Sequence, residues 1–122
     1  DGRPKYMDLK MPWDIHVNSP EEIAGIRKAA RAAREVLDIA GQAVKPGMTT
    51  DEIDELVHSE CVKRGGYPSP LNYNGFPKSV CTSINEVICH GIPCTQTKLK
   101  EGDMLNIDVT VYLDGLGSRV WD

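Results

Sequence analysis

The fold is decided by Met104-Leu105-Asn106-Ile107-Asp108-Val109-Thr110-Val111-Tyr112-Leu113, in which aliphatic side chains recur at every second position. This period of two predicts a β-strand with one aliphatic face, packed on the core, and one more polar face toward solvent. Asp108 lies in the middle of the polar face. A buried carboxylate without a partner is costly, so Asp108 is either exposed to solvent or engaged by a partner such as a metal ion.

Two shorter β-branched runs, Ser79–Ile84 and Val87–Ile92, precede this strand along the chain. Only Asn85-Glu86 separates them, which is the spacing of a β-hairpin. A polar turn at Lys100–Asp103 then leads into the long strand. This half of the chain therefore predicts three antiparallel strands.

Two helices are predicted before the strands, each opened by a capping box, at Ser19–Glu22 and at Thr49–Glu52. Pro46-Gly47 ends the first helix and Gly65-Gly66 ends the second. The apolar stripe predicted for the first helix consists of Ile23, Ile26, Ala30, Ala33, Leu37 and Ala40. The apolar face predicted for the second helix consists of Ile53, Leu56, Val57 and Cys61.

The segment that joins the second helix to the strands is Tyr67–Pro77, which holds three prolines, a glycine and aromatic side chains. Its composition predicts a loop without regular structure. The order of two helices followed by strands predicts an α+β fold, with the helices on one face of an antiparallel sheet.

A length of 122 residues corresponds to one domain. We expect residues 1–18 to form an extended arm, residues 19–115 to form the folded unit, and residues 116–122 to form a separate tail.

Charge and composition exclude several classes of function. The chain carries 14 Lys and Arg against 18 Asp and Glu, a net charge of −4, so it lacks the basic excess of a nucleic-acid-binding protein. Its apolar runs are too short to span a membrane. The four cysteines show no CxxC spacing, which argues against a zinc site, and we expect them to be reduced in an intracellular protein.

His90 and Asp108 are the residues best suited to chemistry. Histidine moves protons near neutral pH and is a common metal ligand, and a carboxylate inside a β-branched strand is unusual. Spacing alone favours a structural role for His90 and leaves Asp108 open between simple exposure and a functional role.

Four motifs carry a resemblance to a known family. They lie at Gly47–Asp54, Pro68–Tyr73, Phe76–Pro93, which contains His90, and Gly102–Thr110, which contains Asp108. Together they resemble type 1 methionine aminopeptidases of the eukaryotic kind, and the resemblance runs from about residue 19 to residue 115. The match at Phe76–Pro93 is long and almost identical to the family's sequence, which makes the resemblance specific.

The resemblance implies half of a pita-bread fold, in which two similar halves enclose a pair of divalent metal ions (Co, Mn, Fe or Zn). It implies removal of the initiator methionine from nascent peptides, at or near the ribosome, by water that the metal ions activate. It also implies a cytoplasmic location, with an organelle as an open alternative.

The resemblance also assigns roles to individual residues. Asp108 matches the first metal-binding aspartate, and His90 matches a histidine that hydrogen-bonds near the scissile amide. An apolar, aromatic and thiol-lined wall suits the methionine side chain. The positions that match this wall are Tyr73, Phe76 and Cys81. Two further positions, whose backbone oxygens bind a monovalent cation in some members, are Asn85 and Val87.

The sequence departs from the family pattern after Gly115. Where the family continues with a Tyr/Phe-His-Gly-Asp segment, this chain has Leu116–Asp122, and Arg119 stands in place of the second metal-binding aspartate. Of the metal ligands that the family uses, only Asp108 matches. We therefore expect this chain to be a truncated form without aminopeptidase activity, and the alternative is a catalytically silent pita-bread relative that binds other proteins. We further expect self-association through an open sheet edge.

Overall fold

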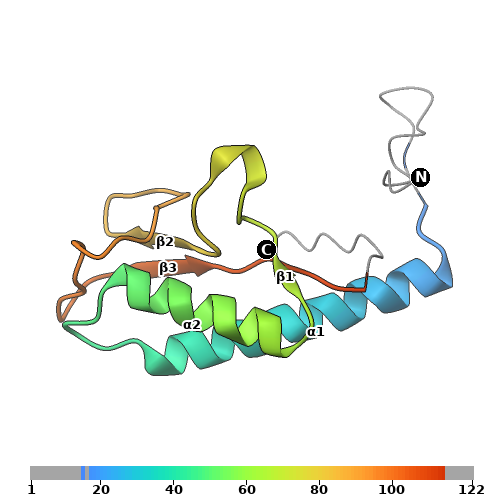
Figure 1. Cartoon of the computed structure of the whole chain (residues 1–122), viewed down its shortest axis with the longest axis horizontal. Coiled ribbons are helices and arrows are strands. Elements are labelled where there is room, and N and C mark those ends of the chain that lie inside the picture. Colours follow the sequence, from blue (N-terminus) through green and yellow to red (C-terminus); the bar gives the residue numbers. More distant parts are fainter. Residues whose placement is uncertain (1–14, 16, 115–122) are drawn as a thin grey trace.

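The computed structural model describes residue 15 and residues 17–114 of the chain (Figure 1). Most of the predicted arm at 1–18 and all of the predicted tail at 116–122 lie outside the described residues. The elements follow one another as α1 (Pro20–Ala43), α2 (Thr50–Lys63), β1 (Tyr67–Pro68), a 3-10 helix (Tyr73–Gly75), β2 (Cys81–Ile84), β3 (Leu105–Asp108) and β4 (Val111–Tyr112). The two helices form one layer and the strands form the other (Figure 1).

Both helices begin at the predicted capping boxes. In α1 the Ser19 hydroxyl accepts from the Glu22 N–H at 3.2 Å, and the Glu22 carboxylate accepts from the Ser19 N–H at 2.7 Å. Thr49 and Glu52 make the same reciprocal pair in α2. Each box satisfies two backbone groups that a helix end otherwise leaves without a partner.

The buried face of α1 differs from the predicted stripe. Ala33 and Ala40 are buried as predicted, but Ile23 is 38% exposed. In Figure 1 the first turns of α1 extend beyond the ends of the described strands, so these strands do not cover this part of the helix. The residues of α1 that are buried are Ala29, Ala32, Ala33, Val36 and Ala40. In α2 the predicted face is confirmed at Ile53, Val57 and Cys61, all fully buried.

The long predicted strand is interrupted between Asp108 and Val111, where its partner changes. β3 pairs antiparallel with β2, so that Cys81 lies opposite Asp108. β4 pairs antiparallel with β1. Between them the Thr110 carbonyl already accepts from the Ser69 N–H at 3.0 Å. The aliphatic residues Val109, Val111 and Leu113 are buried as predicted, but Thr110 of the predicted polar face is also only 6% exposed. The prediction of one continuous strand was wrong.

The predicted hairpin with a strand at Val87–Ile92 was also wrong. This segment is a loop: Asn85, just before it, and His90, within it, adopt φ angles of +53° and +55°, outside the extended region. The loop folds back onto β2, because the Thr82 N–H donates to the Gly91 carbonyl at 2.8 Å. The strand that pairs with β2 is instead β3. The segment predicted as an irregular loop also contains a short strand, β1.

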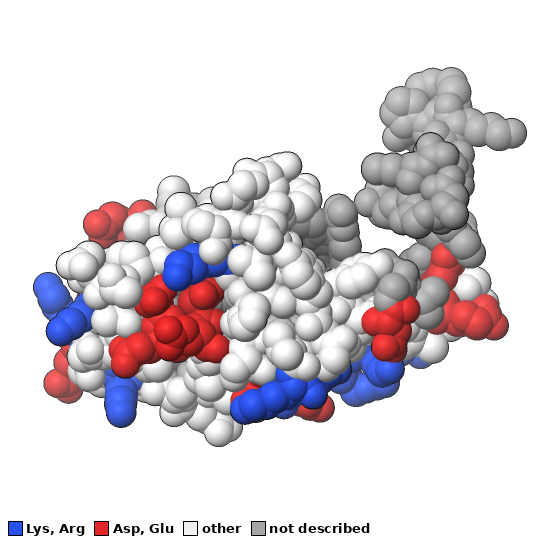
Figure 2. Space-filling view, in the orientation of Figure 1, with Lys and Arg blue, Asp and Glu red and all other residues white. Residues whose placement is uncertain are grey.

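Most charged side chains of the described residues are not buried, with Asp54 and Glu60 as exceptions. Figure 2 shows a group of acidic side chains gathered over α2 with basic side chains beside it. No helix within the described residues has the length and apolar character to cross a membrane.

One buried polar atom is a defect in the core. The Thr82 hydroxyl lies between the layers, opposite Ile107, and meets no hydrogen-bond partner among the described residues. We expect Thr82→Val to raise the free energy of unfolding by about 1 kcal/mol, because valine has the same shape without the unsatisfied hydroxyl. Urea unfolding followed by circular dichroism measures this. Thr82→Ser keeps the hydroxyl and should lower the stability, so equal losses in both variants would contradict the explanation.

Candidate functional site

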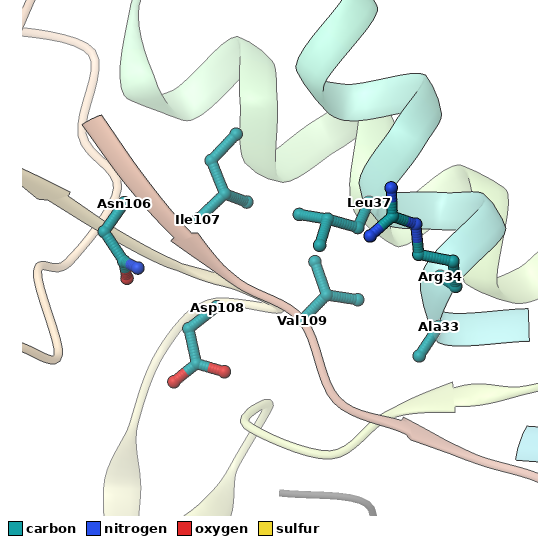
Figure 3. Close-up of a pocket in the computed structure, with 7 residues that line it drawn as sticks. All are labelled: Ala33, Arg34, Leu37, Asn106, Ile107, Asp108 and Val109. Atoms are coloured by element: carbon teal, nitrogen blue, oxygen red, sulfur yellow. The ribbon is translucent and has the colours of Figure 1, made fainter. Parts of the chain in front are cut away.

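The candidate site is built on the face of β3 that points away from the helices. Ile107 and Val109 are directed toward Leu37 of α1, whereas Asn106 and Asp108 point to the opposite side of the strand (Figure 3). The pleat of the strand causes this separation, because neighbouring side chains emerge on opposite faces. The alternation that predicted the fold thus also places the Asp108 carboxylate.

Asp108 is half-buried, and no described residue is hydrogen-bonded or ion-paired to its carboxylate. Directly across the ladder lies Cys81, on the same face, and the Cys81 side chain is only 6% exposed. Burial raises the pKa of the Cys81 thiol to about 11, and the neighbouring charges of Asp108 and Cys89 act in the same direction. Cys81 is therefore a neutral, apolar thiol beside a carboxylate.

The face that carries Asp108 is partly covered, although a solvated polar face was predicted. Ser83 shares this face with Cys81 and is only 3% exposed. Its hydroxyl accepts from the Gly91 N–H at 3.2 Å, so the loop that follows β2 lies on this face. Position 91 has no room for a side chain, because a Cβ there would lie 2.0 Å from the Thr82 carbonyl oxygen. The backbone thus comes as close to the strand as glycine permits.

The structure places the other predicted site residues on two loops. His90 is exposed and stands next to the anchored Gly91. Tyr73 lies in the 3-10 helix and is 51% exposed, and Phe76 follows directly after it and is half-buried. In Figure 1 both loops rise on the side of the strands opposite to the helices, which is the side of Asp108.

Asn85 and Val87 stand at the turn where the chain leaves β2. The Asn85 side chain is well fixed, because its amide donates to Asp103 at 3.0 Å and its oxygen accepts from the Met104 N–H at 3.0 Å. The Val87 N–H donates to the Ile84 carbonyl at 3.1 Å. The carbonyl oxygens of Asn85 and Val87 accept no backbone hydrogen bond within the described part of the chain.

The described residues do not form a complete metal site. Nowhere among residues 15 and 17–114 do three or more His, Cys, Asp or Glu side chains gather in an arrangement that could hold a metal ion. Divalent ions need several ligands for tight binding. Asp108 has the right chemistry and lacks a competing partner, so it fits one position of such a site. The remaining ligands are not supplied by this part of the chain.

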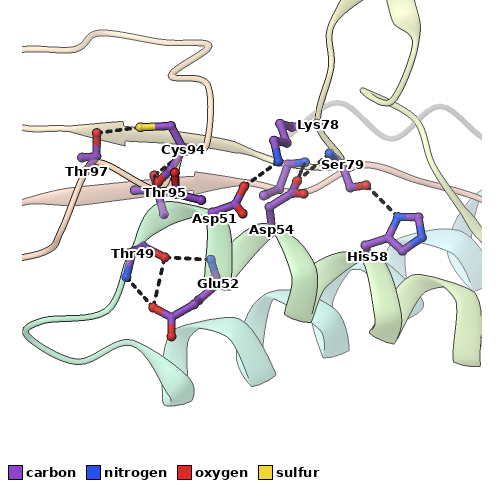
Figure 4. Close-up of polar contacts among 12 residues, drawn as sticks. Thr49, Asp51, Glu52, Asp54, His58, Lys78, Ser79, Cys94, Thr95 and Thr97 are labelled. Carbon is purple, nitrogen blue, oxygen red and sulfur yellow. Dashed lines mark hydrogen bonds and ion pairs between the residues drawn. The ribbon is translucent and has the colours of Figure 1, made fainter.

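Sequence reasoning missed a polar cluster that holds the start of β2 against α2 (Figure 4). The buried Asp54 carboxylate accepts from the Ser79 N–H at 2.6 Å and from the Val80 N–H at 3.2 Å. Beside it, His58 Nδ1 lies 2.8 Å from Ser79 Oγ. Asp54 and His58 are one helical turn apart in the sequence, and this spacing could have indicated that they share a face.

This polar cluster is structural. Ser79 is only 2% exposed, so its hydroxyl is closed to a substrate, and the Asp54 carboxylate bonds to backbone N–H groups of the chain. Lys78 completes the cluster by donating to Asp51, and this hydrogen bond is the main reason that the pKa of Lys78 is raised. His58, in hydrogen-bond contact with the buried Ser79 hydroxyl, therefore belongs to this structural cluster.

All four cysteines are free thiols. Burial raises the pKa of Cys61 to about 11, as it does for Cys81. The pKa of Cys94 is lowered instead, first of all by the hydrogen bond with the Thr97 hydroxyl. The thiol at the candidate site is therefore one of those held neutral by burial.

Comparison with known proteins shows the family of the chain. Residues 24–121 match the model of metallopeptidase family M24. The chain is 60% identical over 102 residues to methionine aminopeptidase 1 of Saccharomyces cerevisiae, covering 84% of this chain and 26% of that protein. It is 54% identical over 117 residues to the mitochondrial methionine aminopeptidase 1D of Danio rerio, covering 93% of this chain and 34% of that protein.

A solved structure extends the likeness to the fold. The crystal structure of methionine aminopeptidase from Rickettsia prowazekii matches with a TM-score of 0.80 at 46% identity, over 82% of this chain and 40% of that one. The predicted α+β fold, as part of a pita-bread fold, is thereby confirmed. The chain spans about a quarter to a third of the length of these curated relatives.

Proposed function

This chain belongs to metallopeptidase family M24, and on that premise we propose that it is the N-terminal part of an aminopeptidase that removes initiator methionine from nascent peptides. The observation that carries the proposal is Asp108, a half-buried strand carboxylate with no described partner, on a face flanked by two loops. The names of the similar proteins support methionine as the residue removed.

We assign Asp108 as one ligand of the divalent metal ions that the family implies. When bound, such ions supply a Lewis acid and lower the pKa of coordinated water. The geometry supports this assignment in two ways. A carboxylate without an ion pair is free to coordinate, and Cys81 next to it stays neutral because burial raises its pKa to about 11.

We assign the wall of the methionine pocket to Tyr73, Phe76 and Cys81. A flexible thioether side chain packs well against aromatic rings and a neutral thiol. Cys81 supplies a buried floor beside Asp108, and the loop with Tyr73 and Phe76 stands on the same side of the strands. His90, held next to the anchored Gly91, would donate a hydrogen bond to the substrate amide. The carbonyl oxygens of Asn85 and Val87 would bind a monovalent cation.

The test uses the natural polypeptide that carries this segment, with Asp108→Asn as the variant. We expect it to release methionine from a Met-Ala peptide on addition of Mn²⁺, and Asp108→Asn to reduce kcat/KM on the order of 100-fold or more, since loss of a supporting partner alone costs about 10- to 100-fold. Asn106→Gln changes the neighbouring residue on the same face and should leave the activity unchanged.

Two results would contradict this proposal. One is full activity in Asp108→Asn, which would remove Asp108 from the site. The other is the absence of methionine release by the natural polypeptide, which would favour the alternative of a silent relative that binds proteins.

The 122-residue chain alone should bind Mn²⁺ only weakly, with a Kd on the order of millimolar or above by calorimetry, because the described residues supply one ligand.

A further inference from the structure

The turn that follows β2 and the turn that precedes β3 are joined by the side chains of Asn85 and Asp103. Asn85 lies opposite Met104, so these two residues extend the antiparallel ladder by one pair. One bond of this pair is regular, because the Asn85 N–H donates to the Met104 carbonyl at 2.9 Å. The other bond goes to the side chain, since the Met104 N–H donates to Asn85 Oδ1 at 3.0 Å. The Asn85 side chain thus takes the place of its own backbone carbonyl in the ladder.

This substitution lets the chain leave the sheet directly after β2. Asn85 has a φ angle of +53°, in the left-handed region, where the chain turns away from the direction of the strand. Asparagine adopts this region more readily than most residues, and its side chain carries both an acceptor and a donor. Asn85 therefore ends β2 and still supplies the acceptor that the Met104 N–H needs.

Asp103 determines which end of the Asn85 amide faces Met104. A reversed amide would set its NH₂ group against the Met104 N–H, and two donors would then meet. The Asp103 carboxylate disfavours this, because an ionised carboxylate only accepts, and it accepts from the Asn85 NH₂ group at 3.0 Å. Its other oxygen accepts from the Lys100 N–H at 2.8 Å. These hydrogen bonds, first that of Asn85 and then that of Lys100, lower the pKa of Asp103, so the carboxylate stays ionised at neutral pH.

The loop that carries His90 is attached to β2 at both of its ends. Its far end is Gly91, whose carbonyl and N–H groups both form hydrogen bonds with β2. Its near end is Asn85, which is held by the contacts described above. Residues 86–90 connect these two attachments. The direction in which the chain leaves Asn85 therefore determines, together with Gly91, where His90 stands.

We propose that Asp103 is a positioning residue of the candidate site, which fixes the loop of residues 86–90 and its His90 through the Asn85 side chain. The consequence for methionine release rests on the proposed function, in which His90 donates a hydrogen bond to the substrate amide. Loss of the contact between Asp103 and Asn85 displaces His90 and leaves the methionine pocket in place. It should therefore lower kcat more than it raises KM.

The test exchanges the two side chains in the natural polypeptide that carries this segment. Asn85→Asp sets a second carboxylate against Asp103. The repulsion should lower kcat about 10-fold and change KM by less than about 3-fold, since a misplacement of about 1 Å costs up to about 100-fold. Asn85→Asp combined with Asp103→Asn restores one amide and one carboxylate with their positions exchanged. This double variant should recover kcat to within about 3-fold of the wild type.

Glu101→Gln and Gln96→Asp are the matched controls. They make the same single changes of charge as Asp103→Asn and Asn85→Asp, on exposed residues outside the contact, and they should leave kcat unchanged.

Amide hydrogen exchange supplies a readout that does not depend on catalysis. In peptides that cover residues 86–90, exchange should be about 10-fold faster in Asn85→Asp and should return to the wild-type rate in the double variant. Peptides from α1 should exchange equally in all variants. Circular dichroism establishes that each variant is folded. Asp103→Asn alone is the milder change, and its faster exchange at residues 86–90 decides the question if Asn85→Asp does not fold.

Three results would overturn the proposal. One is wild-type exchange at residues 86–90 in the single variants. Another is a double variant as impaired as Asn85→Asp, since the two side chains would then not act as a pair. The third is faster exchange with unchanged kcat, because the contact would then be only structural. A wild type that releases no methionine contradicts the proposed function, and the exchange of residues 86–90 then still decides whether Asp103 fixes the loop.

Discussion

Gly91→Ala is expected to lower the free energy of unfolding by about 3 kcal/mol, because the new methyl group has no space. Its Cβ would lie 2.0 Å from the Thr82 carbonyl oxygen and 3.0 Å from the Ser83 Cα. These are backbone atoms of β2, so no side chain can turn aside to relieve the overlap. The loop must instead move away and lose the hydrogen bond from the Thr82 N–H to the Gly91 carbonyl.

Urea unfolding followed by circular dichroism measures this effect, with Gly41→Ala as the matched control. Gly41 lies on the exposed side of α1 and has no atom within 4 Å of a new Cβ. Alanine is a better helix former than glycine, so the control should gain about 0.5–1 kcal/mol. If Gly91→Ala is as stable as the wild type, the loop with His90 does not lie against β2 and the candidate site loses one of its walls.

Asp54→Ala is expected to lower the free energy of unfolding by about 2–5 kcal/mol. The carboxylate accepts from two backbone N–H groups, those of Ser79 and Val80, and these groups are buried. Removing the carboxylate leaves both donors without an acceptor, and each buried unsatisfied donor costs about 1–3 kcal/mol. The start of β2 then loses its attachment to α2.

Asp54→Asn and Glu55→Ala separate this explanation from a general effect of charge on α2. Asparagine keeps an oxygen acceptor at the same place, so it should lose about half as much stability as alanine does. Glu55 is exposed, and its replacement should change the stability by about 0.5 kcal/mol or less. Chemical denaturation of the three variants gives the comparison. A loss as large in Glu55→Ala as in Asp54→Ala would exclude the hydrogen-bonding explanation.

The two helices could be predicted closely because their signals are local. A capping box spans only four residues, and both boxes occur where the sequence places them. The buried face of α1 was less predictable, because Ile23 lies in the first turns of the helix, which the described strands do not reach. An apolar pattern indicates which residues of a helix can be buried. The extent of the neighbouring layer determines which of them are buried.

In the strands, too, the local pattern was predicted correctly and the tertiary pairing was not. The alternation around Asp108 correctly predicted that its carboxylate lies away from the core (Figure 3). The pairing partner was mispredicted, because the short spacing at Asn85-Glu86 favoured a hairpin, whereas β2 pairs with β3 some twenty residues further along the chain. The left-handed conformation of His90 and the hydrogen bonds of Gly91 override the β-branched sequence of this segment.

The sequence by itself determined the helix starts, the α+β order and the face of the strand on which Asp108 stands, since each depends on side chains a few residues apart. Only the tertiary structure decided that Cys81 lies opposite Asp108 and that Asp54 anchors β2. These features join residues that are distant along the chain. The free energies of these contacts depend on desolvation and on hydrogen-bond geometry. Both are established only when the helix layer and the strand layer have packed together.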